Sequence, residues 1–362
     1  MAVYIHQLSN WPRFTWSNEQ IDPLLAELRS RQNRLLGRMD GLGFGLQIEA
    51  NLQILTLDIL KSSEIEGELL NPEQVRSSIA RRLGIEIAGA LKAERDVEGI
   101  VEMMLDATQR FDTSLTAERL FDWHAALFPT GRSGIYKIKT ADWRDEVMQV
   151  TSGPMGKEKI HFEAPAASKV PIEMTVFLEW IEEETNLDPV LKAGIAHLWF
   201  VTIHPFDDGN GRIARAITDL LLARADKTPQ RFYSMSAQIQ AERNHYYDIL
   251  ESTQKGNLDI TPWLLWFLDC LTHSMEQTDE IIAKTMARAQ FWEKHKETLF
   301  NARQQKILHL LLDDFFGHLK VSNYAKITKT STDTALRDLQ DLVKKEVLEQ
   351  QGSGRSTMYK LK

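Results

Sequence analysis

The stretch HPFDDGNGRIAR, residues 204–215, decides how the whole chain is interpreted. It follows the apolar run AGIAHLWFVTI (193–203), which predicts a buried helix that ends where Pro205 prevents a simple continuation. Gly-Asn-Gly at 209–211 lets successive backbone N–H groups turn inward, and such a nest binds anions. Because the residues after the nest have an apolar helical pattern, we expect the nest at a helix N-terminus, where the dipole favours phosphate.

The side chains of this stretch suit a nucleotide triphosphate. Arg212 and Arg215 are three residues apart, so one helical face presents both guanidinium groups to the same phosphate chain. Asp208 is a hard oxygen ligand beside the nest and suits Mg²⁺ that bridges phosphates. His204 can remove a proton from an incoming hydroxyl at neutral pH.

Each part of this stretch, taken alone, also occurs in proteins for purely structural reasons. A histidine can simply end a helix, Gly-Asn-Gly can form an ordinary turn, and an arginine pair can lie on a solvated face. A metal hydrolase built on His204, Asp207 and Asp208 is a further alternative, but no second histidine follows at ligand spacing and the arginines would lack a purpose. The combination within twelve residues favours a site that binds and attacks a nucleotide.

The stretch resembles, at every position, the Fic-domain signature His-x-Phe-x-(Asp/Glu)-Gly-Asn-Gly-Arg-x-x-Arg. The resemblance to the helical core of that family covers roughly 105–255. It implies transfer of AMP from ATP to a Ser, Thr or Tyr hydroxyl of a target protein, with Mg²⁺ and with release of pyrophosphate. Spacing alone leaves attack at the α-phosphate and at the γ-phosphate open, and the choice of the α-phosphate comes from the resemblance.

The resemblance also implies roles for individual residues. His204 is similar to the general base, and Phe206 to the core residue that anchors the loop. Asp208 resembles the Mg²⁺ ligand, and Arg215 resembles the arginine that holds the γ-phosphate. Four residues resemble the phosphate cradle: Gly209, Asn210, Gly211 and Arg212.

A β-hairpin is expected ahead of this stretch. Two short runs at 147–151 and 159–162 flank a Gly- and Pro-containing turn, and they predict the single hairpin of the first three hundred residues. A surface excursion would account for it, but an isolated hairpin is marginal unless it packs or pairs. It resembles the Fic flap, whose edge pairs with an extended segment of the target protein. The resemblance places four flap residues beside the nucleotide, Lys159, Ile160, His161 and Phe162, and two residues against adenosine, Tyr246 and Gln254.

A second motif, SSEIEG at 62–67, ends a predicted helix. Ser62 and Glu66 are four residues apart on one face, and Gly67 permits the C-terminal turn. The motif by itself is consistent with an ordinary polar helix end. It resembles the inhibitory (Ser/Thr)-x-x-x-Glu-(Gly/Asn) motif that precedes some Fic cores, which implies that a Glu66 carboxylate on Arg215 takes the place of a γ-phosphate oxygen.

The rest of the pattern predicts a mainly α protein. Ser17 with Gln20 predicts a capping box before a long amphipathic helix, and a second helix begins near Leu46. Asn71-Pro72 predicts the N-cap and first position of the next helix. Further helices are expected at about 90–110, 116–127, 169–184, 189–203, 211–225, 238–254 and 261 to nearly 300.

The last sixty residues have a different pattern, with helices at 302–314, 321–327 and 331–345 and strands at 347–350 and 357–361. This order resembles a winged helix. Residues 301–362 carry eleven Lys and Arg against seven Asp and Glu, a net charge of +4. A recognition helix from Ser331 with Arg337, and Arg355 in the wing, would suit DNA. The acids Asp333, Asp338 and Asp341 weigh against tight DNA contact and favour protein interaction or dimer packing.

Composition places limits on the kind of protein. The net charge of −8 argues against a surface that coats nucleic acid. Cys270 is the single cysteine, so no intrachain disulfide can form, and we expect it to be a small buried residue. The start shows no export signal, and the most apolar window (260–271) is too short to span a bilayer. We therefore expect a cytoplasmic protein without a membrane partner.

We expect a mainly α fold in four segments: an N-terminal helical region with the inhibitory helix (1–104), a Fic core with its flap (105–255), connecting helices (256–300) and a winged-helix-like domain (301–362). The expected function is self-inhibited AMP transfer from ATP. The alternatives are removal of AMP, transfer of UMP or phosphate on the same scaffold, and a nucleotide-sensing DNA-binding regulator. A homodimer is compatible with the sequence, which names neither the target protein nor what relieves inhibition.

Overall fold

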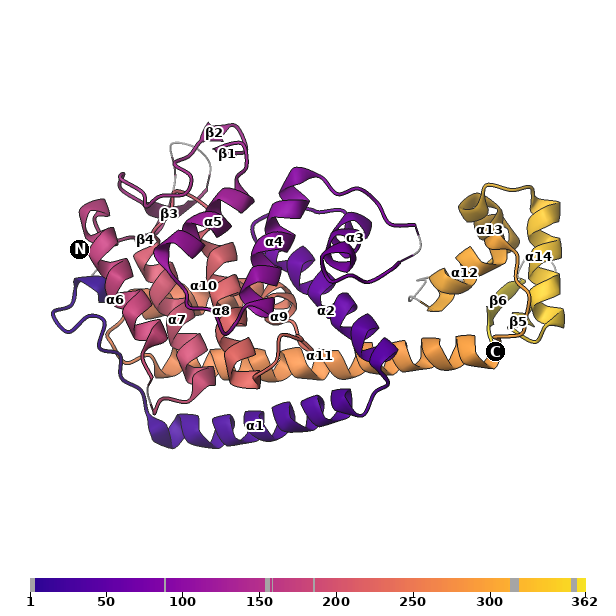
Figure 1. Ribbon diagram of the computed structural model, residues 1–362, viewed down its shortest axis with the longest axis horizontal. Coiled ribbons are helices and arrows are strands. Elements are labelled where there is room, and N and C mark those ends of the chain that lie inside the picture. The colour runs from indigo at the N-terminus through magenta and orange to yellow at the C-terminus, as the bar shows by residue number, and fades with distance from the viewer. Residues whose placement is uncertain are drawn as a thin grey trace. The chain divides into compact units, whose positions relative to one another are not determined.

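The computed structural model describes residues 4–87, 89–153, 157, 159–184, 186–312, 319–352 and 357–362. The described chain is mainly helical, as the sequence predicts (Figure 1). It divides into two compact units, residues 1–279 and 280–362. Among the residues that the structure describes, no helix combines the length and apolar character needed to cross a membrane.

The N-terminal part of the first unit is built from long helices. A short 3-10 turn (Ile5–Gln7) precedes α1 (Asn18–Asp40), and α2 (Phe44–Ile65) ends within the SSEIEG motif at 62–67. Asn71 caps α3 (Pro72–Arg82) by accepting the backbone N–H groups of Glu73 and Gln74, which confirms the predicted N-cap. The next helices are α4 (Arg95–Gln109) and α5 (Ala117–Leu127), the latter capped by Thr116.

Two hairpins follow α5. The first pairs β1 (Arg132–Ser133) with β2 (Tyr136–Lys137), and the second pairs β3 (Gln149–Ser152) with β4 (Lys159–Glu163). The prediction of a single hairpin was wrong, because strands of two residues are too short to show an alternating pattern. The predicted turn residues 154–156 of the second hairpin lie outside the described residues.

Helices α7 (Pro189–Ile203) and α8 (Asn210–Asp226) pack against each other and form the centre of this unit. Almost every residue of α7 is buried, in agreement with its apolar sequence on all faces. At Gly194 a Cβ would lie 2.9 Å from the Phe267 ring, so the glycine allows α11 to approach α7 closely. Helix α6 (Val170–Glu182), which follows a 3-10 turn (Ala167–Lys169), packs on α7.

The remaining helices of this unit correct one prediction and confirm another. The helix expected at 238–254 is two helices, α9 (Met235–Ala241) and α10 (Arg243–Gln254), which are separated at Glu242. Helix α11 spans Thr261–Lys294, and Cys270 on it is buried as expected.

The predicted capping box at the start of α1 was also wrong. Ser17 is the N-cap, but its side chain makes no capping hydrogen bond. Its backbone N–H donates to Thr261 Oγ1 at 2.9 Å, which is the donor that a capping box would offer to Gln20. A contact across the fold therefore replaces the local one.

The second unit contains α12 (Ala302–Leu312), α13 (Val321–Thr328), α14 (Thr332–Lys344) and the antiparallel pair β5 (Leu348–Gln351) and β6 (Met358–Leu361). Ser331 caps α14, as predicted. Asp338 does not face outward as expected of a recognition helix, because it is buried against Arg303 and Tyr324. Arg355 lies outside the described residues.

Candidate active site

His204 stands at the end of α7 in a left-handed backbone conformation with φ 51°. Its Nδ1 lies 3.2 Å from the carbonyl oxygen of Val201. A carbonyl only accepts, so Nδ1 carries the proton and the lone pair of Nε2 is left free. Burial lowers the pKa of His204, and the positive charge of Arg144 lowers it further. The imidazole is therefore neutral at pH 7, the form that a general base needs.

Arg144 holds the backbone on which His204 stands. Its Nε donates to the carbonyl oxygen of His204 at 2.8 Å, and its Nη2 donates to that of Pro165 at 2.5 Å. Its backbone N–H donates to the carbonyl oxygen of Pro205 at 2.9 Å. Sequence reasoning missed this buried arginine, because its partners are backbone carbonyls up to sixty residues away and leave no pattern in the sequence.

Phe206 anchors the loop, as the resemblance implies. It is fully buried and stacks on the ring of His124 at 4.3 Å between centroids. His124 Nδ1 accepts the backbone N–H of Ala141, and its Nε2 donates to the carbonyl oxygen of Asp208. Burial lowers the pKa of His124 to about 4, so this histidine is a neutral support for the loop. Sequence reasoning also missed it.

The side chain of Asn210 holds the backbone of the nest in place. Asn210 Oδ1 accepts the backbone N–H of Phe206 at 3.0 Å, and its Nδ2 donates to the carbonyl oxygen of Phe206 at 2.8 Å. Gly209 has φ 80°, and a Cβ there would lie 2.9 Å from the Phe128 ring. The loop is therefore preorganised by a conformation and a close approach that glycine allows.

Asp208 points toward the first hairpin. One carboxylate oxygen accepts the hydroxyl of Ser133 on β1, and the other accepts the backbone N–H of Gly209 at 2.6 Å. Asp207 turns away and accepts the backbone N–H of Lys139 at 2.8 Å. Within the described residues no three His, Cys, Asp or Glu side chains converge on a metal position. A cation bound by Asp208 would therefore need ligands other than a group of such side chains among the described residues.

The end of α2 lies directly on α8. Arg215 Nε donates to Ser62 Oγ at 2.9 Å, and its Nη2 donates to the carbonyl oxygen of Ser62 and to Glu66 Oε1, each at 2.8 Å. Arg215 is buried, whereas the Glu66 side chain is 31% exposed. A Cβ on Gly211 would clash with Glu66 Oε1, so the glycine admits the carboxylate to the nest. Gly67, with φ 85°, turns the chain after this contact.

Arg212 does not join Arg215 as the spacing predicts. Its Nη1 donates to Glu68 Oε2 at 2.7 Å, and its guanidinium lies 5.0 Å from the centre of the Phe128 ring. Its Nε is buried without a hydrogen-bond partner. The two arginines are thus engaged by two different acids that follow α2 in the sequence.

One cavity of about 610 Å³ is lined by residues of the His204 loop, the start of α8, the end of α2 and the β3–β4 hairpin. It is lined by most of the predicted site residues, namely Glu66, His161, Phe162, His204, Asp208, Asn210, Gly211, Arg215, Tyr246 and Gln254. Six predicted residues are not part of its wall: Ser62, Gly67, Lys159, Ile160, Gly209 and Arg212.

Comparison with known proteins agrees with this geometry. The model described as "Fic/DOC family" matches residues 114–222. Residues 114–222, which include the His204 loop and most of α8, are thus similar to that family. A model described as "Domain of unknown function (DUF4172)" matches residues 4–85, the part of the chain that carries α2.

Curated proteins that are similar to this chain are named "Protein adenylyltransferase Fic". The protein from Culex quinquefasciatus is 25% identical over 276 residues, which cover 74% of this chain and 50% of the relative. That from Drosophila yakuba is 33% identical over 114 residues, which cover 31% of this chain and 21% of the relative. The matched part thus spans at most about half of the length of these relatives.

Solved structures share the fold. A Fic family protein from Desulfovibrio desulfuricans G20 aligns over 97% of this chain and 98% of its own, with a TM-score of 0.54 and 21% identity. A Fic domain-containing signalling protein from Bacteroides thetaiotaomicron covers 72% of this chain and 97% of its own, with a TM-score of 0.53 and 21% identity. At these identities the likeness concerns the fold alone.

Tyr246 and Gln254, the two residues predicted to contact adenosine, lie in the wall of the cavity that contains His204. Tyr246 is buried on α10, and its hydroxyl lies 3.0 Å from His197 Nε2. Gln254 is buried at the end of the same helix and donates to Thr202 Oγ1 at 3.2 Å. Both therefore have structural partners in addition to their places on the cavity wall.

The β3–β4 hairpin is anchored by residues near the N-terminus of the chain. Phe162 of β4 is buried against Tyr4, with 5.1 Å between the ring centroids. His6 Nε2 lies 2.8 Å from the carbonyl oxygen of Glu163. Packing on residues remote in sequence thus provides the support that an isolated hairpin needs.

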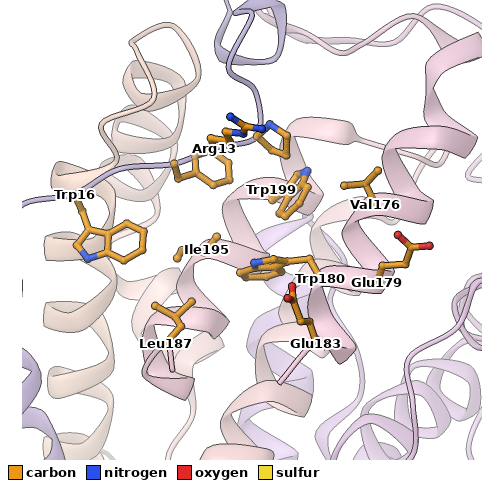
Figure 2. Close-up of a pocket in the computed structure, with 11 residues that line it drawn as sticks. Arg13, Trp16, Val176, Glu179, Trp180, Glu183, Leu187, Ile195 and Trp199 are labelled. Carbon is orange, nitrogen blue, oxygen red and sulfur yellow. The ribbon is translucent and has the colours of Figure 1, made fainter. Parts of the chain in front are cut away.

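A second cavity, of about 640 Å³, lies elsewhere in the first unit (Figure 2). Trp16, Trp180 and Trp199 contribute large aromatic surfaces to its wall, and Glu179 and Glu183 add carboxylates. Its wall contains no histidine and no glycine among the described residues. Arg13 adds one positive charge, but the described wall offers neither a histidine base nor a glycine nest for phosphate chemistry.

Proposed function

We propose that this chain is a protein adenylyltransferase that inhibits itself through Glu66. It transfers AMP from ATP to a hydroxyl side chain of a target protein and releases pyrophosphate. The observation that carries the proposal is one cavity that contains a neutral imidazole beside the N-terminus of α8. The names of the curated relatives support AMP transfer over phosphate transfer.

The base is His204. With Nδ1 donating to Val201, Nε2 accepts the proton of the target hydroxyl as its oxygen attacks the α-phosphorus. Arg144 and the asparagine bridge of Asn210 keep the loop in place during this step. The phosphates lie at the nest, where the backbone N–H groups and the helix dipole stabilise negative charge.

The carboxylate of Asp208 suits Mg²⁺. It accepts hydrogen bonds from two uncharged groups, the Ser133 hydroxyl and the Gly209 backbone N–H. Mg²⁺ commonly binds one or two carboxylates together with substrate phosphates and water. When bound, the ion would offset the charge of the leaving pyrophosphate. The lack of a protein-only cluster among the described residues agrees with an ion that arrives with the nucleotide.

The target is proposed to add a strand to the β3–β4 hairpin. Main-chain pairing gives affinity with little side-chain specificity, and it would present a hydroxyl to the cavity that β3 and β4 line.

Glu66 supplies the brake in this proposal. Its carboxylate holds Arg215 at 2.8 Å and lies against Gly211, where a γ-phosphate would otherwise bind. A charge-assisted hydrogen bond contributes about 1.5–3 kcal/mol, which is about ten- to a hundredfold in competition with ATP. ATP that binds beside an intact pair would have its α-phosphate out of line for attack.

Labelled ATP tests both parts of the proposal. Glu66→Gly is expected to raise AMP transfer by about ten- to a hundredfold, because Arg215 is released. Glu66→Gln is the matched control: it keeps the shape but loses the charge, so an intermediate gain is expected. If Glu66→Gly gave no gain in AMP transfer, the proposal that Glu66 inhibits the enzyme would be wrong. Intact masses that show UMP or phosphate on the modified protein would overturn AMP transfer.

Removal of AMP is the second candidate function. Glu66 lines the same cavity as His204, so its carboxylate can orient a water toward a modified target. Loss of AMP from a modified protein with the unaltered chain, and not with Glu66→Gly, would support it.

A further inference from the structure

The β1–β2 hairpin, which the sequence pattern did not reveal, brings a hydroxyl group to Asp208. Ser133 on β1 donates its hydroxyl to Asp208 Oδ2, although 75 positions separate the two residues in the chain. Asp208 Oδ1 accepts the backbone N–H of Gly209 at 2.6 Å. Each oxygen of the carboxylate therefore has one donor, and the group cannot rotate without weakening a hydrogen bond.

The support of Asp208 comes from two sides. Of the hydrogen bonds that described residues make to its carboxylate, the one from Ser133 comes from outside the 204–215 stretch. The main chain of Asp208 has a separate support, because His124 Nε2 on α5 donates to its carbonyl oxygen at 3.2 Å. The backbone of Asp208 is thus held from α5, and the orientation of its carboxylate depends on Ser133.

Backbone pairing fixes the place of this hydroxyl. Ser133 pairs with Tyr136 across the hairpin. Next to this pair, the carbonyl oxygen of Gly131 accepts the backbone N–H of Ile138 at 3.1 Å. A supporting side chain on a paired strand is placed more precisely than one on an irregular loop.

Ser133 contacts the carboxylate from outside the cavity. Asp208 lines the cavity that contains His204, whereas Ser133 is half-buried and is not among the described residues of its wall. A carboxylate has about four lone-pair positions, and the two donors use two of them. The other positions are available to a cation, and the Ser133 hydroxyl acts on that cation through Asp208.

We propose that Ser133 is a positioning residue that holds the Asp208 carboxylate in the orientation that Mg²⁺ needs. This inference rests on the proposed function, because it concerns the ion that accompanies ATP there. Mg²⁺ demands nearly ideal octahedral geometry, so a carboxylate that turns is a poorer ligand. Loss of a hydrogen-bond partner of a metal ligand typically lowers metal affinity by about 10- to 100-fold.

The test measures ATP binding and not AMP transfer. The full-length parent chain carries Glu66→Gly, which releases Arg215, and His204→Asn, which removes the base, so that bound ATP is not consumed. Equilibrium dialysis with labelled ATP gives one dissociation constant with Mg²⁺ and one with EDTA. By linkage, their ratio reports how much more tightly Mg²⁺ binds to the ATP complex of the protein than to free ATP.

Ser133→Ala in this parent is expected to lower the ratio by about 10- to 100-fold. ATP binding in EDTA should stay unchanged, because the hydroxyl is not part of the cavity wall. A purely structural loss would instead weaken ATP binding in EDTA as well. Ser133→Thr keeps a hydroxyl at this position and should restore the ratio of the parent.

Tyr136→Phe is the matched control. It also removes a hydroxyl from the hairpin, on the residue that pairs with Ser133, but this side chain is 67% exposed. The ratio should therefore stay at the value of the parent. If Tyr136→Phe lowered the ratio as much as Ser133→Ala, the role given to the Ser133 hydroxyl would be wrong.

Asp208→Asn separates this inference from the proposed function. If Asp208→Asn lowers the ratio and Ser133→Ala does not, the positioning role is wrong while Asp208 remains the ligand of the ion. If neither substitution changes the ratio, the ion does not bind at Asp208. The magnesium site of the proposed function then fails, and the inference fails with it.

Discussion

The two cavities of the first unit have similar volumes, about 610 and 640 Å³, but different walls. In the first, His204, Arg215 and Glu66 converge on one helix N-terminus. In the second, tryptophan rings surround the space and the carboxylates of Glu179 and Glu183 accompany them (Figure 2). The two cavities thus differ in the groups that line them and not in size: the second also contains Arg13, but among the described residues its wall has no histidine and no glycine.

Backbone conformation also distinguishes the two cavities. His204 and Gly209, within the loop of the first cavity, have left-handed conformations. None of the described residues in the wall of the second cavity has a positive φ. A left-handed residue other than glycine costs of order 1–3 kcal/mol and persists where the surroundings enforce it, often at functional sites.

The largest expected effect is at His204. In a Glu66→Gly background, His204→Ala should lower AMP transfer to protein acceptors by about 10²–10⁴-fold, because no base then takes the proton. His204→Asn is the control for folding, since asparagine tolerates the left-handed conformation. If both variants kept AMP transfer, His204 would not be the base, and the first cavity would no longer differ from the second in containing one.

Arg144 should have the next largest effect. Arg144→Leu leaves buried carbonyl groups of the His204 loop without a donor, so we expect unfolding in urea to lose roughly 1.5–3 kcal/mol. Arg132→Leu changes an exposed arginine whose guanidinium donates to the carbonyl oxygen of Ile135, and it should cost less than about 0.5 kcal/mol. Equal losses for the two variants would contradict the role given to Arg144.

The pH dependence of transfer should be a smaller effect. Burial lowers the pKa of His204 from 6.5, so the neutral base persists below that value and transfer should fall only at a lower pH. The negative charge of Glu66 raises the same pKa, so Glu66→Gly should move the acid limb further down. A midpoint above 6.5 in a pH–rate profile would argue against His204 as the base.

The smallest effect is expected in the second cavity. Glu179→Gln and Glu183→Gln change its charge without contacting the nest, so AMP transfer by the Glu66→Gly variant should stay within about twofold. A larger change would show that the two cavities are coupled.

Each part of the site that the sequence could predict lies within a short contiguous motif. The signature and the nest lie within twelve residues, and Glu66 was found from its spacing to Ser62 together with the resemblance. Arg144 and His124 were not predictable, because each acts through backbone groups of a distant loop. A single arginine or histidine whose partners are carbonyls has no spacing to recognise.

The fold shows the same limit. Helices with clear apolar periodicity or a local cap were predicted within a few residues, as for α3 with Asn71. The β1–β2 hairpin was missed because its strands are two residues long, and Thr261 replaced the expected partner of the Ser17 backbone. Where tertiary contacts compete with local ones, the sequence pattern no longer predicts the local structure.

Glu66 and Arg215 belong to one polypeptide, so their encounter is a unimolecular event. Diluting the protein cannot separate them, since their effective concentration is set by the chain between α2 and α8. An agent that loosens α2, or a triphosphate abundant enough to displace the carboxylate, acts on this pair directly. If Glu66 inhibits as we propose, inhibition should therefore depend on the concentration of ATP and not on the concentration of the protein.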